Sequence, residues 1–276
     1  MKRKHKGRAD IWIRVIALIA ILATIGAVAY VQFSGTGSKV EQAISQVEIA
    51  TPESSTDDEE PASDAASSEL NTGDFFPIID EGEPVDADYF DDAVFIGDSI
   101  INGLKLNSAI VRSSTWLVND NMTVASAETD TIELDDGTTT KLLDALDAEQ
   151  YGKVYIMLGV NDLTAPADEW AGQYEELLAD IAEKQPDAVI YVMGVMPVSR
   201  IAAQGKDHLA PASIVSHNQA LFKVLWNNGY YYLDTYGQFA DAEGYLASED
   251  NTDGIHLTAS KYLEMYQYIC GRTVEN

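Results

Sequence analysis

From about residue 88 onward, short continuous apolar stretches of this chain alternate with amphipathic stretches, and this alternation limits the possible folds more than any other feature. Strands that read as unbroken apolar runs are typical of sheets covered on both faces, with helices as the crossovers between parallel strands. The pattern predicts an α/β fold, a three-layer α/β/α sandwich with a mostly parallel five-stranded sheet.

The apolar and amphipathic stretches give the expected elements. The predicted strands are Ala93–Ile96, Thr115–Val118, Lys153–Leu158, Ala188–Val195 and Tyr230–Leu233. The predicted helices are Ser99–Leu106, Lys141–Glu149, Ala167–Lys184, Ser213–Asn227 and Thr258–Cys270. The turn signal Asp135-Asp136-Gly137 predicts an inserted hairpin.

The N-terminal region has a different composition. Residues 1–10 form a basic head, and residues 11–33 are almost entirely apolar, with Arg14 as the one charged residue. An apolar stretch of about 20 residues can span a ~30 Å hydrocarbon core, and basic residues favour the cytoplasmic side. We therefore expect a transmembrane signal-anchor in the cell membrane, crossing once, with the rest of the chain extracytoplasmic. The alternative is secretion after cleavage near Ala29, because Ala27-Val28-Ala29 resembles a signal-peptidase site.

Residues 34–74 contain few large apolar residues and many Ser, Thr, Asp and Glu. Such a segment cannot bury enough apolar surface to offset its ordering entropy, so we expect a disordered linker. Residues 75–79, Phe-Phe-Pro-Ile-Ile, are expected to pack on the domain formed by residues 75–276. The whole chain has a formal net charge of −28, and residues 34–276, with 11 basic and 44 acidic residues, have a net charge of −33. This charge disfavours nucleic acid and anionic lipid as partners.

The chain has a single cysteine, Cys270, and four histidines. One cysteine excludes an internal disulfide, and its apolar position in the last predicted helix favours simple packing. Without a cluster of Cys and His we predict no structural zinc site, and the sequence points to no cofactor.

Gly97-Asp98-Ser99 follows the first predicted strand and opens a predicted helix. Ligand sites of open α/β sheets lie beyond the carboxyl ends of strands, so Ser99 is expected at the reactive edge. Its backbone N–H, at a helix N-terminus, favours negative charge. The structural alternative is that Ser99 caps the helix and Asp98 is a turn residue.

Gly159-Val160-Asn161-Asp162 follows the strand Lys153–Leu158. Gly159 permits close backbone approach, and the Asn161 amide can donate a hydrogen bond to a developing oxyanion. The alternative is an Asx turn, with Asp162 as the cap of a short helix.

Asp253-Gly254-Ile255-His256 precedes the last predicted helix. The three-residue spacing lets the Asp253 carboxylate reach the Nδ1–H of His256 while Nε2 faces a serine, which is the arrangement of a serine hydrolase. The alternative is an exposed loop histidine.

In order and spacing these motifs resemble the SGNH/GDSL hydrolase superfamily of esterases and lipases, of a bacterial membrane-anchored type. The resemblance covers about residues 93–269 and implies a flavodoxin-like sandwich. It implies Ser99 as nucleophile, His256 as general base and then acid, and Asp253 as the residue that orients the imidazole. It also implies an oxyanion hole lined by the Ser99 N–H and Asn161, with Gly97, Asp98, Gly159 and Asp162 in support.

One feature departs from the family pattern. Members usually have a glycine between the first and third motifs whose N–H completes the oxyanion hole, but residues 119–123 read Asn-Asp-Asn-Met-Thr. Asn119 or Asn121 could adopt the positive φ that glycine supplies, and Asn121 is our candidate for this donor. Loss of the donor would lower the rate by ~10²–10³.

Other residues carry weaker signals. His217 is expected on the surface of a helix rather than as a second base, and His208, in the loop 198–211, is a candidate for substrate contact. Three apolar residues either wall an acyl pocket or belong to the core: Trp116, Met122 and Leu163.

These observations favour an exported, membrane-tethered serine esterase that forms an acyl-enzyme. The expected substrates are O-acetyl groups on cell-wall polysaccharide or peptidoglycan, because of the family resemblance and the predicted location. A lipase, lysophospholipase or thioesterase for longer acyl chains is the first alternative. A non-catalytic surface binding protein with a degenerate hydrolase fold is the second.

Overall fold

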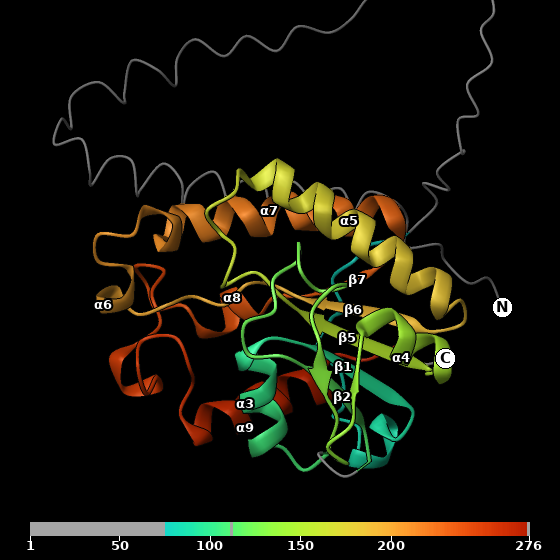
Figure 1. Ribbon diagram of the computed structural model, residues 1–276. Helices are drawn as coiled ribbons and strands as arrows, with labels where there is room; N and C mark the ends of the chain where they lie inside the picture. Colours follow the sequence, from blue (N-terminus) through green and yellow to red (C-terminus); the bar gives the residue numbers. More distant parts are fainter. Residues whose placement is uncertain (1–74, 111–112, 275–276) are drawn as a thin grey trace, which may run out of the picture. The chain divides into compact units, whose positions relative to one another are not determined.

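The computed structural model describes residues 75–110 and 113–274, and these form one five-stranded sheet with helices on both faces (Figure 1). The strand order is β2-β1-β5-β6-β7, and every neighbouring pair is parallel. The strands are β1 (Ala93–Gly97), β2 (Thr115–Val118), β5 (Lys153–Met157), β6 (Val189–Met193) and β7 (Tyr231–Leu233). The predicted three-layer sandwich and its parallel sheet are confirmed.

The helices divide between the two faces of the sheet. One face packs against α4 (Leu142–Ala148), α5 (Ala167–Lys184) and α7 (Pro211–Asn228). The other packs against α3 (Ser99–Asn107) and α9 (Ala259–Cys270). In β1, Val94 and Ile96 point into the first core, and Ala93 and Phe95 point into the second, as the two-residue period of a strand requires.

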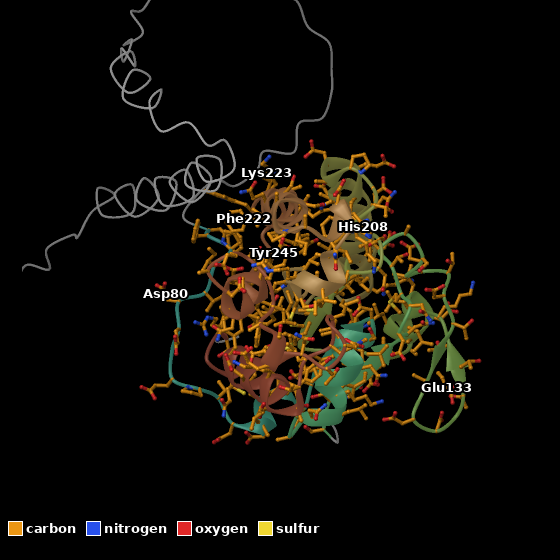
Figure 2. The ribbon with its side chains drawn as sticks, turned by 90° about the vertical axis from the view of Figure 1, so that its left-hand side faces the viewer. Asp80, Glu133, His208, Phe222, Lys223 and Tyr245 are labelled. Atoms are coloured by element: carbon orange, nitrogen blue, oxygen red, sulfur yellow. The ribbon has the colours of Figure 1, made fainter. Side chains whose placement is uncertain are left out.

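Shorter elements fill the connections. These are the antiparallel hairpin β3 (Ile132–Glu133) and β4 (Thr139–Thr140), the helices α6 (Arg200–Ala203) and α8 (Thr235–Phe239), and the 3₁₀ turns η2 (Ala87–Phe90), η3 (Asp207–Leu209) and η4 (Ser248–Asp250). The hairpin was predicted from its turn signal, and its Glu133 lies at the rim of the domain (Figure 2). The helices α6 and α8 were not predicted, because four or five residues are too few to show a helical period.

A row of stacked aromatic rings crosses the sheet on the face covered by α3 and α9. The in-register parallel strands set Trp116, Phe95, Tyr155, Tyr191 and Tyr231 side by side. Successive ring centroids are 4.5, 4.8, 4.5 and 5.7 Å apart. These contacts link all five strands through side chains as well as through the backbone.

The segment Phe75–Ile79 packs on the domain, as predicted. The Tyr232 N–H donates to the Pro77 carbonyl oxygen over 2.8 Å, and Ile78 forms a parallel bridge with Tyr232. The ring of Phe75 contacts that of Tyr231, with centroids 5.4 Å apart. The segment therefore covers the outer edge of β7, which would otherwise expose unpaired backbone groups.

The basic head of residues 1–10, the signal-anchor of residues 11–33, the cleavage position near Ala29 and the linker of residues 34–74 all lie outside the described residues. Within residues 75–110 and 113–274, none of the helices has the length and apolar character needed to cross a membrane.

Candidate active site

The site begins at the carboxyl end of β1. Asp98 is the N-cap of α3, and its carboxylate accepts a hydrogen bond from the Ile100 N–H over 2.9 Å. Ser99 is the first residue of α3, so its backbone N–H has no acceptor within the helix and is available to an anion. A side chain at Gly97 would overlap Ile101 and the Met157 carbonyl, so this position needs glycine.

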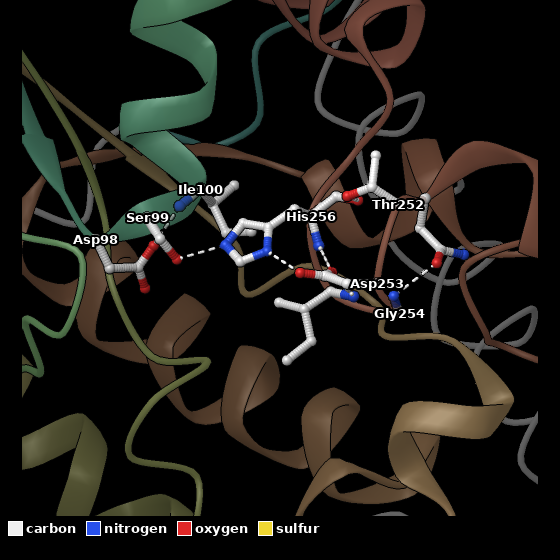
Figure 3. Close-up of polar contacts among 9 residues, drawn as sticks. Asp98, Ser99, Ile100, Thr252, Asp253, Gly254 and His256 are labelled. Atoms are coloured by element: carbon white, nitrogen blue, oxygen red, sulfur yellow. Dashed lines mark hydrogen bonds and ion pairs between the residues drawn. The ribbon is translucent and has the colours of Figure 1, made fainter.

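A line of hydrogen bonds joins the first and third motifs (Figure 3). The Ser99 Oγ lies 2.8 Å from the Nε2 of His256, and the Nδ1 of His256 lies 2.7 Å from the Oδ2 of Asp253. The carboxylate fixes the tautomer with hydrogen on Nδ1, which leaves Nε2 free to accept the Ser99 proton. A hydroxyl, a base and an orienting acid are thus in contact in the order that nucleophilic catalysis requires.

The Asp253 carboxylate is held ionised by its own loop. Partial burial raises its pKa, but hydrogen bonds from the His256 backbone and ring and from the Ile255 N–H outweigh that effect and lower the pKa to about 2. The two backbone bonds measure 2.9 and 3.0 Å. Gly254 has φ +100°, and a side chain there would meet Ser199 Oγ at 2.7 Å, so glycine permits the bend.

Asp98 has the opposite electrostatic environment. Its side chain is 1% exposed, and this burial raises its pKa to about 7, although the hydrogen bond from Ile100 works against the shift. The nearby Asp162 carboxylate raises the pKa further, and His256 lowers it. A buried carboxyl directly before Ser99 therefore changes charge near neutral pH.

The second motif lies beside the segment that follows β2. The Asn161 amide nitrogen is 3.3 Å from the Asp120 carbonyl oxygen and 3.2 Å from that of Met122. Asn161 thus contacts this segment, and no hydrogen bond joins it to Ser99 or His256 in the part of the chain described here.

Asn121, the candidate for the missing glycine, has its N–H engaged. It donates to Asn119 Oδ1 over 3.0 Å in an Asx turn. Gly159 of the second motif does have a positive φ, +137°, and a side chain there would meet Val195 and Trp170 at 2.6 and 2.8 Å. Asn121 could donate to an oxyanion only after releasing Asn119, and this role remains a prediction.

Asp162 ties the second motif to its surroundings. Its Oδ2 accepts from the Val124 N–H over 2.8 Å, and its Oδ1 accepts from the Trp170 Nε1–H over 3.1 Å. Burial raises the pKa of Asp162, and these two hydrogen bonds oppose the shift. Asp162 links the loop to a neighbouring segment and to α5, so it does more than close an Asx turn.

A small hollow adjoins the three motifs. Its walls include Ile100, Val160 and Ile255, which are sequence neighbours of Ser99, Asn161 and His256. The remaining lining residues are Asp98, Met157, Leu158, Val195, Met196, Pro197 and Val198. The apolar wall of residues 195–198 was not singled out in the sequence, because only the fold brings the end of β6 to this edge.

Burial decides the predictions for His217 and for three apolar residues. His217 was expected on the surface, and this was wrong: it is 4% exposed, with both ring nitrogens facing carbonyl oxygens. His208 lies half-buried in η3 and is labelled in Figure 2; its contact with substrate remains a prediction. The three apolar candidates for pocket walls belong to the hydrophobic cores: Trp116, Met122 and Leu163.

Cys270 is buried within α9, as its apolar position predicted. Among the described residues, His, Cys, Asp and Glu form no group of three or more that could hold a metal ion.

An α/β sandwich with a hydroxyl, an imidazole and a carboxylate in line at the carboxyl edge of its sheet is typical of hydrolases that act on acyl groups. The sequence matches the GDSL-like Lipase/Acylhydrolase family over residues 95–262, and the chain belongs to that family. In the broad sense of the family it is an ester-hydrolysing enzyme, as the motifs suggested. No curated protein matches the chain.

The chain is similar to several solved structures, and two of those described here share its fold at TM-scores just above 0.5. A Streptococcus pneumonia protein provisionally named as a platelet activating factor is 24% identical, with a TM-score of 0.51 over 64% of this chain and 81% of its own. A provisionally named acylhydrolase from Bacteroides fragilis NCTC 9343 is 18% identical, with a TM-score of 0.51 over 64% and 83%. A GDSL-like lipase from Bacteroides thetaiotaomicron VPI-5482 is 18% identical, with a TM-score of 0.48 over 68% and 89%.

Proposed function

We propose that this protein is a serine esterase in which Ser99, His256 and Asp253 form a catalytic triad. The observation that carries the proposal is the unbroken line of hydrogen bonds, 2.8 and 2.7 Å long, from Ser99 to Asp253. Each distance is within the range in which a proton passes between a nucleophile and its base.

In the proposed reaction His256 Nε2 takes the Ser99 proton as Oγ attacks the ester carbonyl carbon. The carbonyl oxygen becomes an oxyanion, stabilised by the Ser99 N–H and by Asn161, whose amide turns one N–H toward it from the Asp120 or Met122 carbonyl oxygen. The intermediate collapses, the alkoxide leaves with the proton from His256, and an acyl-enzyme remains. Water, deprotonated by His256, then releases the carboxylic acid and restores Ser99.

For the substrate we propose short acyl esters, with O-acetyl groups of cell-wall polysaccharide or peptidoglycan as the first class. The small hollow beside Ile100 and Ile255 supports a short acyl group. The location rests on the sequence: a signal-anchor in residues 11–33, or cleavage near Ala29, and a linker of residues 34–74 that extends from the membrane. A flexible chain of about 40 residues spans on the order of 35 Å, and charge repulsion extends it.

The test is hydrolysis of nitrophenyl acetate, butyrate and octanoate by the full-length protein in detergent, with Ser99→Ala as the matched control. Ser99→Ala is expected to lower turnover by about 10⁴-fold or more because it removes the nucleophile, and acetate is expected to be the best of the three esters. Equal turnover by Ser99→Ala would refute the triad. A preference for octanoate would favour the lipase alternative instead.

A further inference from the structure

His217 is a buried polar residue that the proposed triad does not use. It lies on α7, and its Nδ1 is 2.8 Å from the Ser213 carbonyl oxygen of its own helix. Its Nε2 is 3.0 Å from the carbonyl oxygen of Ala165, which is 52 residues away in the sequence. A polar ring in a core is costly unless it is hydrogen-bonded, so the position of this ring depends on its polar contacts.

Ala165 belongs to the loop that carries the second motif. This loop, residues 159–166, connects β5 to α5 and includes both Asn161 and Asp162. The His217 ring also packs edge-on against Trp170, with centroids 5.3 Å apart. His217 therefore holds the end of the loop directly and supports the indole that contacts its middle.

The Trp170 indole is in turn hydrogen-bonded to Asp162. Trp170 Nε1 donates to one carboxylate oxygen over 3.1 Å, and the Val124 N–H donates to the other over 2.8 Å. Asn161, the preceding residue, contacts the Asp120 and Met122 carbonyl oxygens in the same segment as Val124. His217 is thus linked to the segment after β2 by its polar contact with Ala165, its ring contact with Trp170 and the two hydrogen bonds of Asp162.

We propose that His217, acting through Ala165, Trp170 and Asp162, is a positioning residue that holds the Asn161 amide in place for the oxyanion. This inference rests on the proposed function. An oxyanion donor lowers the barrier only when its position is fixed before charge develops. The two contacts of Asn161 measure 3.2 and 3.3 Å, at the long end of the range for hydrogen bonds, so the loop that carries Asn161 contributes to fixing its position.

The test compares two substitutions of the same ring. His217→Phe keeps an aromatic ring against Trp170 but removes the polar contact with the Ala165 carbonyl oxygen. His217→Gln keeps a polar group of similar reach. With nitrophenyl acetate and the full-length protein, His217→Phe is expected to lower kcat about 10-fold or more with KM within about 2-fold, since a misplaced donor acts on the transition state. His217→Gln is expected to recover most of kcat.

A double-mutant cycle with Asn161→Ala separates positioning from general damage to the fold. If His217 acts through Asn161, His217→Phe should change kcat by less than about 2-fold once Asn161 is alanine, because coupled effects do not multiply. Independent effects in the double variant, or full kcat in His217→Phe, would overturn the proposal.

Hydrogen–deuterium exchange provides a readout without substrate. Residues 159–166 should exchange faster in His217→Phe than in the wild type and in His217→Gln, and unchanged exchange there would overturn the proposal even if no ester were turned over. Turnover by Ser99→Ala equal to that of the wild type would instead refute the proposed triad, and the exchange experiment would still decide whether His217 holds the loop.

Discussion

At the scale of single residues, the site combines two carboxyls with opposite environments. Asp253 is exposed and accepts three hydrogen bonds within its loop, so it stays ionised and can orient His256 throughout the usual pH range. Asp98 is buried and accepts one hydrogen bond, from Ile100. The difference follows from hydrogen bonding and burial, because the two side chains are chemically identical.

The raised pKa of Asp98 predicts a dependence of stability on pH. With a pKa of about 7 in the folded state and an ordinary value of 3.8, the folded state holds a proton that the unfolded state loses as pH rises between these values. Protonation of Asp98 therefore contributes its full share to the free energy of unfolding below pH 3.8, and this contribution is lost as the pH rises through about 7. The loss is at most ~1.4 kcal/mol per pH unit.

Asp98→Asn removes this titration and keeps an oxygen that can accept the Ile100 N–H. Urea unfolding at pH 4, 5.5, 7 and 8.5 should show the variant gaining stability relative to the wild type up to about pH 7 and then staying level. A constant difference at all four pH values would show that Asp98 does not titrate in this range.

At the scale of elements, two glycines within helices differ in how closely other atoms approach them. Gly103 of α3 faces Tyr262 of α9, and an added Cβ would overlap the phenol ring, which is 3% exposed. Gly172 of α5 has no atom within 4 Å of an added Cβ. The same residue type therefore has a packing role in one helix and none in the other.

Alanine substitutions at these two positions should have opposite effects. Gly103→Ala is expected to destabilise the protein by about 1–3 kcal/mol, because the buried ring of Tyr262 must move. Gly172→Ala should stabilise it by about 0.5–1 kcal/mol through helix propensity alone. Denaturant unfolding measures both, and equal effects would show that α3 and α9 are not closely packed.

At the scale of the whole molecule, the dominant property is charge. The formal net charge of −28 comes from 45 acidic and 17 basic residues in 276. Self-repulsion of this size opposes the compact state, and added salt screens it within a Debye length of about 10 Å at 0.1 M.

The melting temperature of the full-length protein should therefore rise when NaCl is raised from 10 to about 300 mM. KCl should act equally if screening of the charge is the cause. A melting temperature that fell or stayed constant in both salts would show that repulsion does not limit stability.

The sequence by itself predicted the parallel sheet, the five helices α3, α4, α5, α7 and α9, two motifs at strand ends and a third before the last helix. It could do so because burial on both faces of a strand and the period of a helix both appear as patterns of apolar residues that are close in the sequence. It also predicted that Asp253 would reach His256, since three residues in one loop set that contact.

Only the tertiary structure decided which distant groups meet. The family resemblance implied that Ser99 and His256 meet, but no local pattern brings together two residues that are 157 positions apart. Their contact, the burial of His217 against Ala165 and the wall of residues 195–198 depend on how the crossover helices return the strands to one edge. His217 illustrates the limit: its helix has polar neighbours in sequence, but the face it occupies is set by packing against α5. Such contacts depend on how the whole core packs, so no local sequence pattern predicts them.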